Sequence, residues 1–158
     1  MPMLALALLT SCRAAPRAST DSRKQQLASE IATAMNAKDY AKAQTPAAEA
    51  TRIDPKFAEA WVGYGMASMR LGQPDHAREA YERALALHQA RHRRNPSDAN
   101  QVVQQIFVLT LLGRAAEAEK LLKQAHTDYP NDQQIAQLAA GAFTSMKEGV
   151  AIVTVEAK

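Results

Sequence analysis

The fold is decided by residues 58–84, which read AEAWVGYGMASMRLGQPDHAREAYERA. Glycine adopts the left-handed backbone conformation at little cost, so Gly72 predicts the end of one helix and a tight turn into the next. Gly65, Ala77 and Ala84 are small, as residues must be where two helices approach closely. The stretch therefore predicts a pair of packed helices.

The same markers recur along the chain at constant spacing. Ala43 and Ala77 are 34 residues apart, whereas Ala77 and Ala118 are 41 residues apart. One insertion of seven residues, between Ala84 and Pro96, accounts for every departure from the shorter period. A single insertion that restores the register of all markers indicates a repeat protein.

These residues resemble the tetratricopeptide repeat, whose period is 34 residues. The second unit carries the family's marker residues as Trp61, Gly65, Gly72, Ala77, Tyr81 and Ala84. The resemblance covers residues 24–132. It implies an all-α, right-handed superhelical solenoid of about three helix-turn-helix repeats plus a C-terminal capping helix.

The predicted organisation has seven parts. They are a lipoprotein-type signal (1–12), a flexible tether (13–20), a divergent first repeat (24–57), a second repeat whose second helix is extended by seven residues (58–98), a third repeat (99–132), a capping helix (133–148) and a tail (149–158).

Two segments depart from this plan. In the first repeat, Lys38 stands at the turn position and Pro46 falls inside the second helix, so we expect a kink there or a helix that starts at Pro46. The tail is β-prone from Val150 to Val155, but a lone strand has no partner in this fold. We therefore predict a disordered tail.

The composition favours helices and limits the possible partners. Strong helix formers fill most of the chain, and the net charge of +3 is spread along it, without a basic tract that would indicate nucleic acid binding. The single cysteine, Cys12, excludes an internal disulfide and a multi-cysteine metal site.

Cys12 ends an apolar run that is too short to span a membrane. The stretch Leu9-Thr10-Ser11-Cys12 resembles the bacterial lipobox, which implies lipidation of Cys12, and Arg13 after it favours the outer membrane, facing the periplasm. Residues 1–11 contain no Lys or Arg, which a start codon placed too far downstream would explain. The alternative is a cytoplasmic protein with an apolar N-terminal segment and a free thiol.

Binding in this architecture is expected on the concave surface, which the first helix of each repeat lines. The repeat positions predict a groove formed by Met35, Val62, Met66, Met69, Arg70, Val103, Gln104, Phe107 and Leu111. Methionine and other apolar side chains make an adaptable lining that suits a peptide or a partner helix. The alternative is that several of them pack against the neighbouring repeat or the capping helix.

The extended helix of the second repeat ends in a basic cluster. Its members, His88, Arg91, His92, Arg93 and Arg94, predict a secondary surface for anionic lipid or an acidic partner. The two histidines are four residues apart, but no third ligand is near in sequence, so no metal site is predicted. The alternative is a solvated helix end whose cations suit the helix dipole.

No catalytic or cofactor motif is present in the sequence. The pair Gly63-x-Gly65 has Ser68 at the third glycine position, and the sequence contains no P-loop, nucleophile elbow or H-E-x-x-H. The resemblance also excludes the co-chaperone type of carboxylate binding, because Ala28 and Ala32 replace its Lys and Asn.

We therefore predict a non-enzymatic adaptor that binds a protein or peptide, needs no cofactor and is anchored in the bacterial envelope. The resemblance to short lipoproteins of pilus assembly suggests its setting. A soluble cytoplasmic scaffold is the alternative, and a metal-binding or enzymatic accessory protein a remote one. The sequence leaves the partner and the oligomeric state open.

Overall fold

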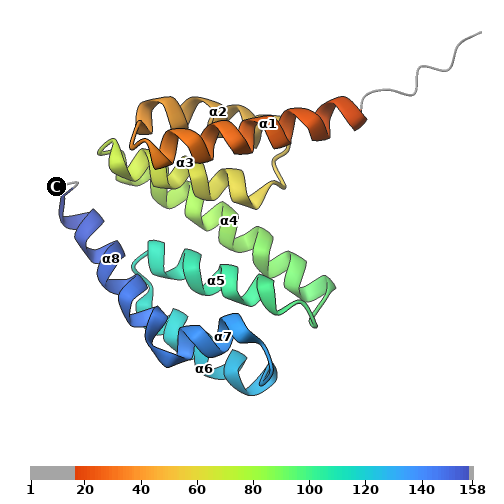
Figure 1. The fold of residues 1–158 in the computed structure, drawn as a ribbon, viewed down its shortest axis with the longest axis vertical. Coiled ribbons are helices and arrows are strands. Elements are labelled where there is room, and N and C mark those ends of the chain that lie inside the picture. The colour runs from red at the N-terminus through yellow and green to blue at the C-terminus, as the bar shows by residue number, and fades with distance from the viewer. Residues whose placement is uncertain (1–16, 157–158) are drawn as a thin grey trace, which may run out of the picture.

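The computed structural model describes the backbone of residues 17–156 and the side chains of residues 20–150. All regular structure in this range is helical (Figure 1). The elements are α1 (Arg17–Asn36), α2 (Tyr40–Ile53), α3 (Ala58–Arg70), α4 (Pro74–Arg94), α5 (Ala99–Leu111), α6 (Ala115–Asp128), α7 (Gln133–Gln137), the π-helical segment η1 (Leu138–Ala142) and α8 (Phe143–Glu156). From α1 to α6, each helix packs on the next one in the chain, so the predicted all-α solenoid is confirmed.

The three helix pairs turn in the same way. Lys38, Gly72 and Gly113 end the first helix of each pair with φ values of 57°, 70° and 71°. In each turn this residue donates its N–H to the carbonyl three residues back, and the next residue donates to the carbonyl five residues back. These two bonds are how a helix ends at a left-handed residue. The predicted role of the two glycines is confirmed, and Lys38 takes the same role at a higher conformational cost.

Small residues mark the close approaches of the helices. A Cβ atom added to Gly65 would lie 2.5 Å from the ring of Tyr81 on α4, so only glycine fits there without a shift. The alanines at the equivalent positions of the repeats are fully buried, namely Ala43, Ala50, Ala77, Ala84, Ala118 and Ala125.

The insertion lies wholly within one helix. α4 has 21 residues, whereas its counterparts α2 and α6 have 14 each. The seven-residue difference equals the length of the insertion predicted for the second helix of the second repeat. Because seven residues make almost two helical turns, the extension keeps the same face of α4 against the solenoid.

The structure corrects two predictions near the N-terminal end, namely the tether through residue 20 and a helix start at Pro46. α1 begins at Arg17, so residues 17–20 are helical and not part of a tether; residues 13–16 lie outside the described range. α2 begins at Tyr40, because the side chain of Asp39 accepts a hydrogen bond from the N–H of Lys42 and caps the helix there. Pro46 is buried inside α2, six residues after its start, and does not begin it.

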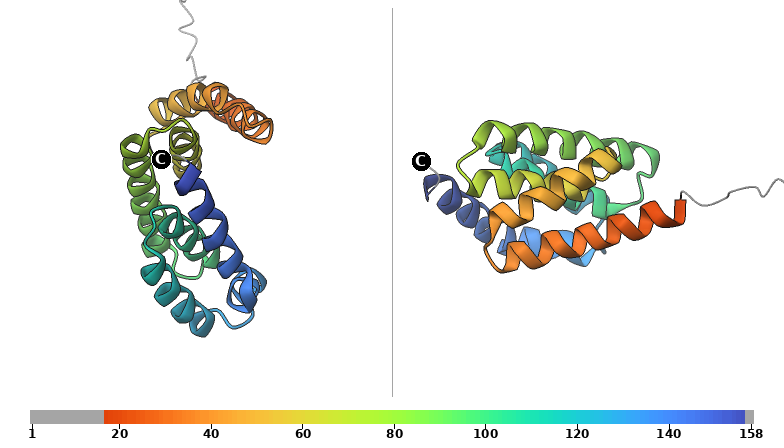
Figure 2. Two further views of the ribbon diagram at one scale, coloured as in Figure 1. Left: turned by 90° about the vertical axis from the view of Figure 1, so that its left-hand side faces the viewer. Right: turned by 90° about the horizontal axis from the view of Figure 1, so that it is seen from above.

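The predicted capping helix and tail are also different in the structure. The capping segment is broken at Gly141, which has φ 131° and ψ −15°, and the new helix α8 runs on to Glu156 where a disordered, β-prone tail was expected. A helix satisfies its own backbone hydrogen bonds, which a lone strand cannot do. α8 turns back along the solenoid and contacts α5 (Figure 2).

The buried core is divided unequally along the solenoid. The main cluster joins α4 to α8 and includes Ile106, Ile135 and Phe143, whereas two small clusters hold α1, α2 and α3 together. α8 is anchored in the main cluster through Phe143, which is 5% exposed. Within the described range, no helix is long and apolar enough to cross a bilayer.

Candidate partner-binding groove

An open cavity of about 550 Å³ lies between the first helices of the pairs and α8. Six of the predicted groove residues line it, namely Met35, Met66, Met69, Arg70, Phe107 and Leu111. They come from α1, α3 and α5, at or near the C-terminal ends of these helices. The structure therefore brings together most of the residues that the repeat positions predicted.

Three predicted groove residues do not line this cavity. Val62 and Val103 are half-buried and pack against the main core cluster. Gln104 is half-buried on α5 beside Val103. All three lie toward the N-terminal halves of α3 and α5, whereas the cavity lies where α8 meets the other ends of these helices.

The sequence did not identify the residues that α8 contributes. Met146, Gly149 and Val150 line the cavity and share one face of α8. Their i, i+3, i+4 spacing is a helical signal, but the β-prone residues that follow obscured it. Tyr40 and Tyr81, from the second helices α2 and α4, complete the aromatic part of the lining.

Phe107 is the large apolar side chain of the lining that is most available for a partner. It is half-buried, yet it belongs neither to a buried cluster nor to the partly buried residues packed against one. Met66, Met69 and Leu111, by contrast, also pack on the main cluster. Replacing Phe107 should therefore change the groove more than it changes the core.

The charged residues in the lining are both basic. Lys38 and Arg70 border the cavity, and no Asp or Glu is among its lining residues. The guanidinium of Arg70 lies 5.4 Å from the centre of the Tyr40 ring, a distance at which a cation and an aromatic face attract each other. Burial raises the pKa of the Tyr81 hydroxyl, so this side chain is neutral.

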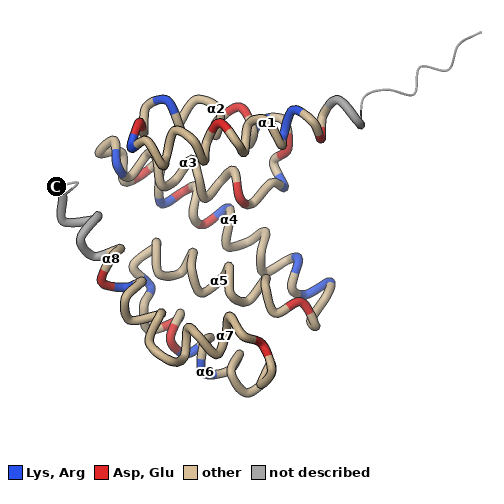
Figure 3. The backbone as a smooth tube through the Cα atoms, viewed as in Figure 1, with Lys and Arg blue, Asp and Glu red and all other residues tan. Residues whose placement is uncertain are grey.

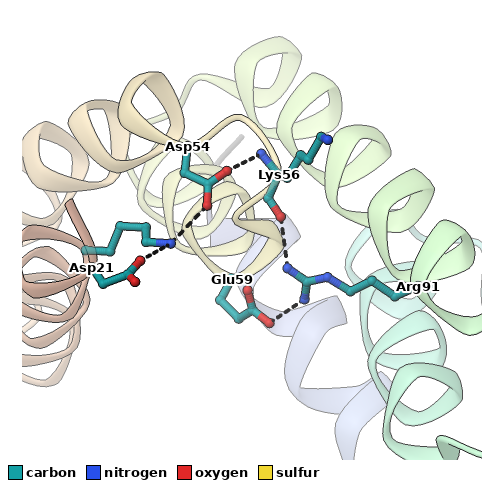
Figure 4. A network of polar contacts seen from close by, with 6 residues as sticks. Asp21, Asp54, Lys56, Glu59 and Arg91 are labelled. Atoms are coloured by element: carbon teal, nitrogen blue, oxygen red, sulfur yellow. Dashed lines mark hydrogen bonds and ion pairs between the residues drawn. The ribbon is translucent and has the colours of Figure 1, made fainter. Parts of the chain in front are cut away.

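The predicted basic surface at the end of α4 is only partly formed. Arg91 donates to the carboxylate of Glu59 at 2.8 Å and to the carbonyl oxygen of Lys56 at 2.9 Å (Figure 4). His88 is buried, at 1% exposed, and His92 is half-buried, which leaves Arg93 and Arg94 exposed. Figure 3 shows the basic residues at this end of α4. Three of the five members therefore pack against the protein or bond to it, and only Arg93 and Arg94 are exposed.

His88 belongs to a buried polar chain between α4 and α5. Its Nδ1 lies 3.0 Å from Oε1 of Gln101, which fixes the proton on Nδ1, and Gln101 donates from Nε2 to Asp98 at 3.1 Å. Nε2 of His88 and Nδ1 of His92 are buried without a hydrogen-bond partner. The described residues contain no group of three or more His, Cys, Asp or Glu side chains that could hold a metal ion.

A comparison with known families supports the assignment of the repeat. Residues 58–90, which form α3 and most of α4, match the family model of the tetratricopeptide repeat. No curated protein sequence matches the chain. Proteins built from this repeat are typically non-enzymatic scaffolds that bind other proteins, and the match suggests an adaptor of this class.

Proposed function

We propose that the protein is a non-enzymatic adaptor that binds a peptide or helix of a partner protein in the cavity between α1, α3, α5 and α8. The observation that carries this proposal is the cavity itself, which has a mostly apolar lining with residues from six helices. Binding sites for small ligands and peptide anchors are concave and apolar in the same way.

The chemistry of the lining suits a partner that is held by side-chain burial. Methionines from α1, α3 and α8 face the cavity, and their flexible thioether side chains adapt to apolar groups of different shape. Phe107 supplies a rigid aromatic surface, the kind of residue that dominates binding energy at interfaces.

The groove is tested by comparing two variants in a crosslinking experiment. A photoreactive phenylalanine analogue at position 107 should crosslink to a partner in cells, and unmodified protein in excess should compete for that partner. Phe107→Ala should compete at least about fivefold less well, because truncation of an anchoring aromatic side chain costs more than about 1 kcal/mol. Ile53→Ala, which removes an exposed apolar side chain from α2 outside the cavity, is the matched control and should compete like the unmodified protein. Equal competition by Phe107→Ala would refute the groove as the binding site.

We further propose that the adaptor is anchored in the bacterial outer membrane through a lipid on Cys12, where it serves pilus or envelope-complex assembly. This proposal rests on the resemblance of residues 9–12 to a lipobox, and these residues lie outside the described range. Metabolic labelling with a palmitate analogue should label the protein but not Cys12→Ala. The absence of label from both, with the protein in the soluble fraction, would favour the cytoplasmic scaffold.

A further inference from the structure

We infer that the solenoid docks on anionic lipid head groups through one of its edges. The basic edge consists of four exposed cations, namely Arg52, Lys56, Arg93 and Arg94. This inference rests on the proposed outer-membrane anchor and specifies how the anchored solenoid is oriented. The edge differs from the basic surface that the sequence predicted, because two of its four residues come from the end of the first repeat.

The structure places the four cations on neighbouring segments. Arg52 lies in the last turn of α2, and Lys56 follows in the loop to α3. The guanidinium of Arg91 donates to the carbonyl oxygen of Lys56 at 2.9 Å, so the last turn of α4, with Arg93 and Arg94, lies beside this loop. The ends of α2 and α4 and the starts of α1 and α3 lie on the same side of the solenoid (Figure 1), and Figure 3 shows basic residues along it.

The carboxylates near the basic edge do not neutralise it. Three of them have other partners in ion pairs, namely Glu49 with Arg23 at 2.7 Å, Asp54 with Lys24 at 3.2 Å and Glu59 with Arg91 at 2.8 Å. Asp98 accepts a hydrogen bond from the neutral Gln101, so its charge offsets one of the four cations. None of the four cations forms an ion pair with a described residue, which leaves a surplus of three positive charges.

The basic edge lies where a lipid on Cys12 would hold the protein. α1 begins at Arg17 on this side, and Lys24 of α1 binds Asp54 at the start of the loop that contains Lys56. Arg17 is five residues after Cys12, and five residues span at most about 18 Å. An anchored chain therefore brings this side of the first two repeats to the bilayer surface.

The distribution of the charges favours a bilayer over an acidic protein. The cations come from two helix ends and one loop, and a protein partner would need carboxylates at matching positions. An anionic bilayer needs no such match, because each basic residue near its surface strengthens binding about fivefold. This attraction extends over only about 8 Å at physiological ionic strength, a range within which the anchor would keep the edge.

Binding of full-length Cys12→Ala to lipid vesicles tests the edge without the anchor. At low salt this chain should bind vesicles of phosphatidylcholine with phosphatidylglycerol more tightly than vesicles of phosphatidylcholine alone. The further changes Arg93→Glu and Arg94→Glu should weaken the tighter binding at least about tenfold. Arg83→Glu with Lys120→Glu makes the same charge change at exposed positions of α4 and α6 away from the edge, and this control should bind like the parent chain.

The orientation is measured with a fluorophore on a single cysteine. Cys12→Ala contains no other cysteine, so one can be introduced at a chosen position. A fluorophore at Ser97→Cys, in the loop after α4, should become protected from quenching by iodide when anionic vesicles are added. A fluorophore at Ala116→Cys, exposed in the first turn of α6, should stay accessible.

The outcomes separate this inference from the proposed anchor. No preference for anionic vesicles, an equal loss of binding in both charge variants, or equal protection of both fluorophores would overturn the basic edge as the docking surface. Palmitate label on Cys12 together with any of these results would leave the anchor in place. Selective binding by the edge without label on Cys12 would keep the docking surface and refute the anchor.

Discussion

Arg91 donates to Glu59 across 2.8 Å, so the end of α4 is tied to the first turn of α3. The same guanidinium donates to the carbonyl oxygen of Lys56. The N–H of Lys56 donates to the carboxylate of Asp54, which also accepts a hydrogen bond from Lys24 on α1 (Figure 4). The network links α1, the loop between α2 and α3, and the extended part of α4. The seven-residue insertion therefore contacts the start of its own repeat and the end of the first repeat, through residues that a standard repeat lacks.

Removing this tie should destabilise the fold by a small, measurable amount. We expect Arg91→Ala to lower the free energy of unfolding by about 1 kcal/mol, because one exposed ion pair and one hydrogen bond are lost. Urea denaturation of Arg91→Ala, Glu59→Gln and the double variant forms a double-mutant cycle. It should give an interaction free energy between the two residues of about 0.5 kcal/mol. Arg93→Ala is the control: Arg93 is exposed on the same helix, two residues after Arg91, and its replacement should leave the midpoint of urea denaturation unchanged. Strict additivity of the two single changes would contradict the network.

His88 should make stability depend on pH. Burial lowers the pKa of its imidazole below the ordinary 6.5, and Arg91 acts in the same direction, although the hydrogen bond to Gln101 and the Glu59 carboxylate oppose them. Below pH 6.5 the unfolded chain therefore binds a proton that the folded chain does not, so stability falls as the pH is lowered through this value.

Denaturation between about pH 7.5 and about pH 5.5, above the range where most carboxylates titrate, measures this effect. We expect a loss on the order of 1 kcal/mol in the unmodified protein and a flatter profile in His88→Gln. His76→Gln, at an exposed position of α4, should retain the full pH dependence. If His88→Gln keeps the same slope, another group is responsible.

Lys38 occupies a turn position that its repeat equivalents give to glycine. At φ 57° a residue with a Cβ atom is strained, so Lys38→Gly should stabilise the protein by roughly 0.5–1 kcal/mol. The reciprocal change Gly113→Ala, at φ 71°, should destabilise it by about 1 kcal/mol. The midpoint temperatures of thermal denaturation of the two variants should shift in opposite directions. A shift of both in the same direction would show that the turns are not equivalent.

The contact between Gly65 and Tyr81 should tolerate no added methyl group. Gly65→Ala places its Cβ 2.5 Å from the buried ring, and we expect a loss of about 2 kcal/mol from overpacking. Gly149→Ala is the matched control, since no atom lies within 4 Å of its added Cβ, and alanine is favoured in a helix. Chemical denaturation should therefore show a loss of stability in the first variant and none in the second.

Gly141 should control the position of α8. Its φ of 131° is accessible to glycine but strained for alanine, so Gly141→Ala should weaken the turn that returns α8 to the groove, at a cost of roughly 1–3 kcal/mol. Amide hydrogen exchange should become faster in α8 while α3 and α4 stay protected. Unchanged protection of α8 would show that its contacts, and not the turn, hold it in place.

Most of the solenoid could be read from local spacing. The markers Gly72 and Gly113 terminate helices through their own backbone preference, and the seven-residue insertion appears unchanged as the greater length of α4. The wrong predictions are a helix start at Pro46, a tether that includes residues 17–20 and a disordered tail. The cap at Asp39 starts α2 before Pro46, and α8 continues through the β-prone segment.

The candidate groove was partly predictable for the same reason. Met66 and Phe107 follow from their places in the repeat, because equivalent positions of stacked helices face the same side. Met146 could not be assigned to the groove lining, because nothing in the sequence shows that the chain reverses at Gly141 and brings α8 against α5.

By itself, then, the sequence determined the helix pairs, their turns and their register, because these depend on residues close together in the chain. Only the tertiary structure decided that Arg91 pairs with Glu59, that His88 is buried and that α8 lines the cavity. Those outcomes depend on contacts between residues far apart in the sequence, such as Arg91 with Glu59, and on how much surface each side chain can bury. The basic cluster thus supplies an ion pair between α4 and α3, and the start of the β-prone tail lies in the helix that lines one side of the candidate groove.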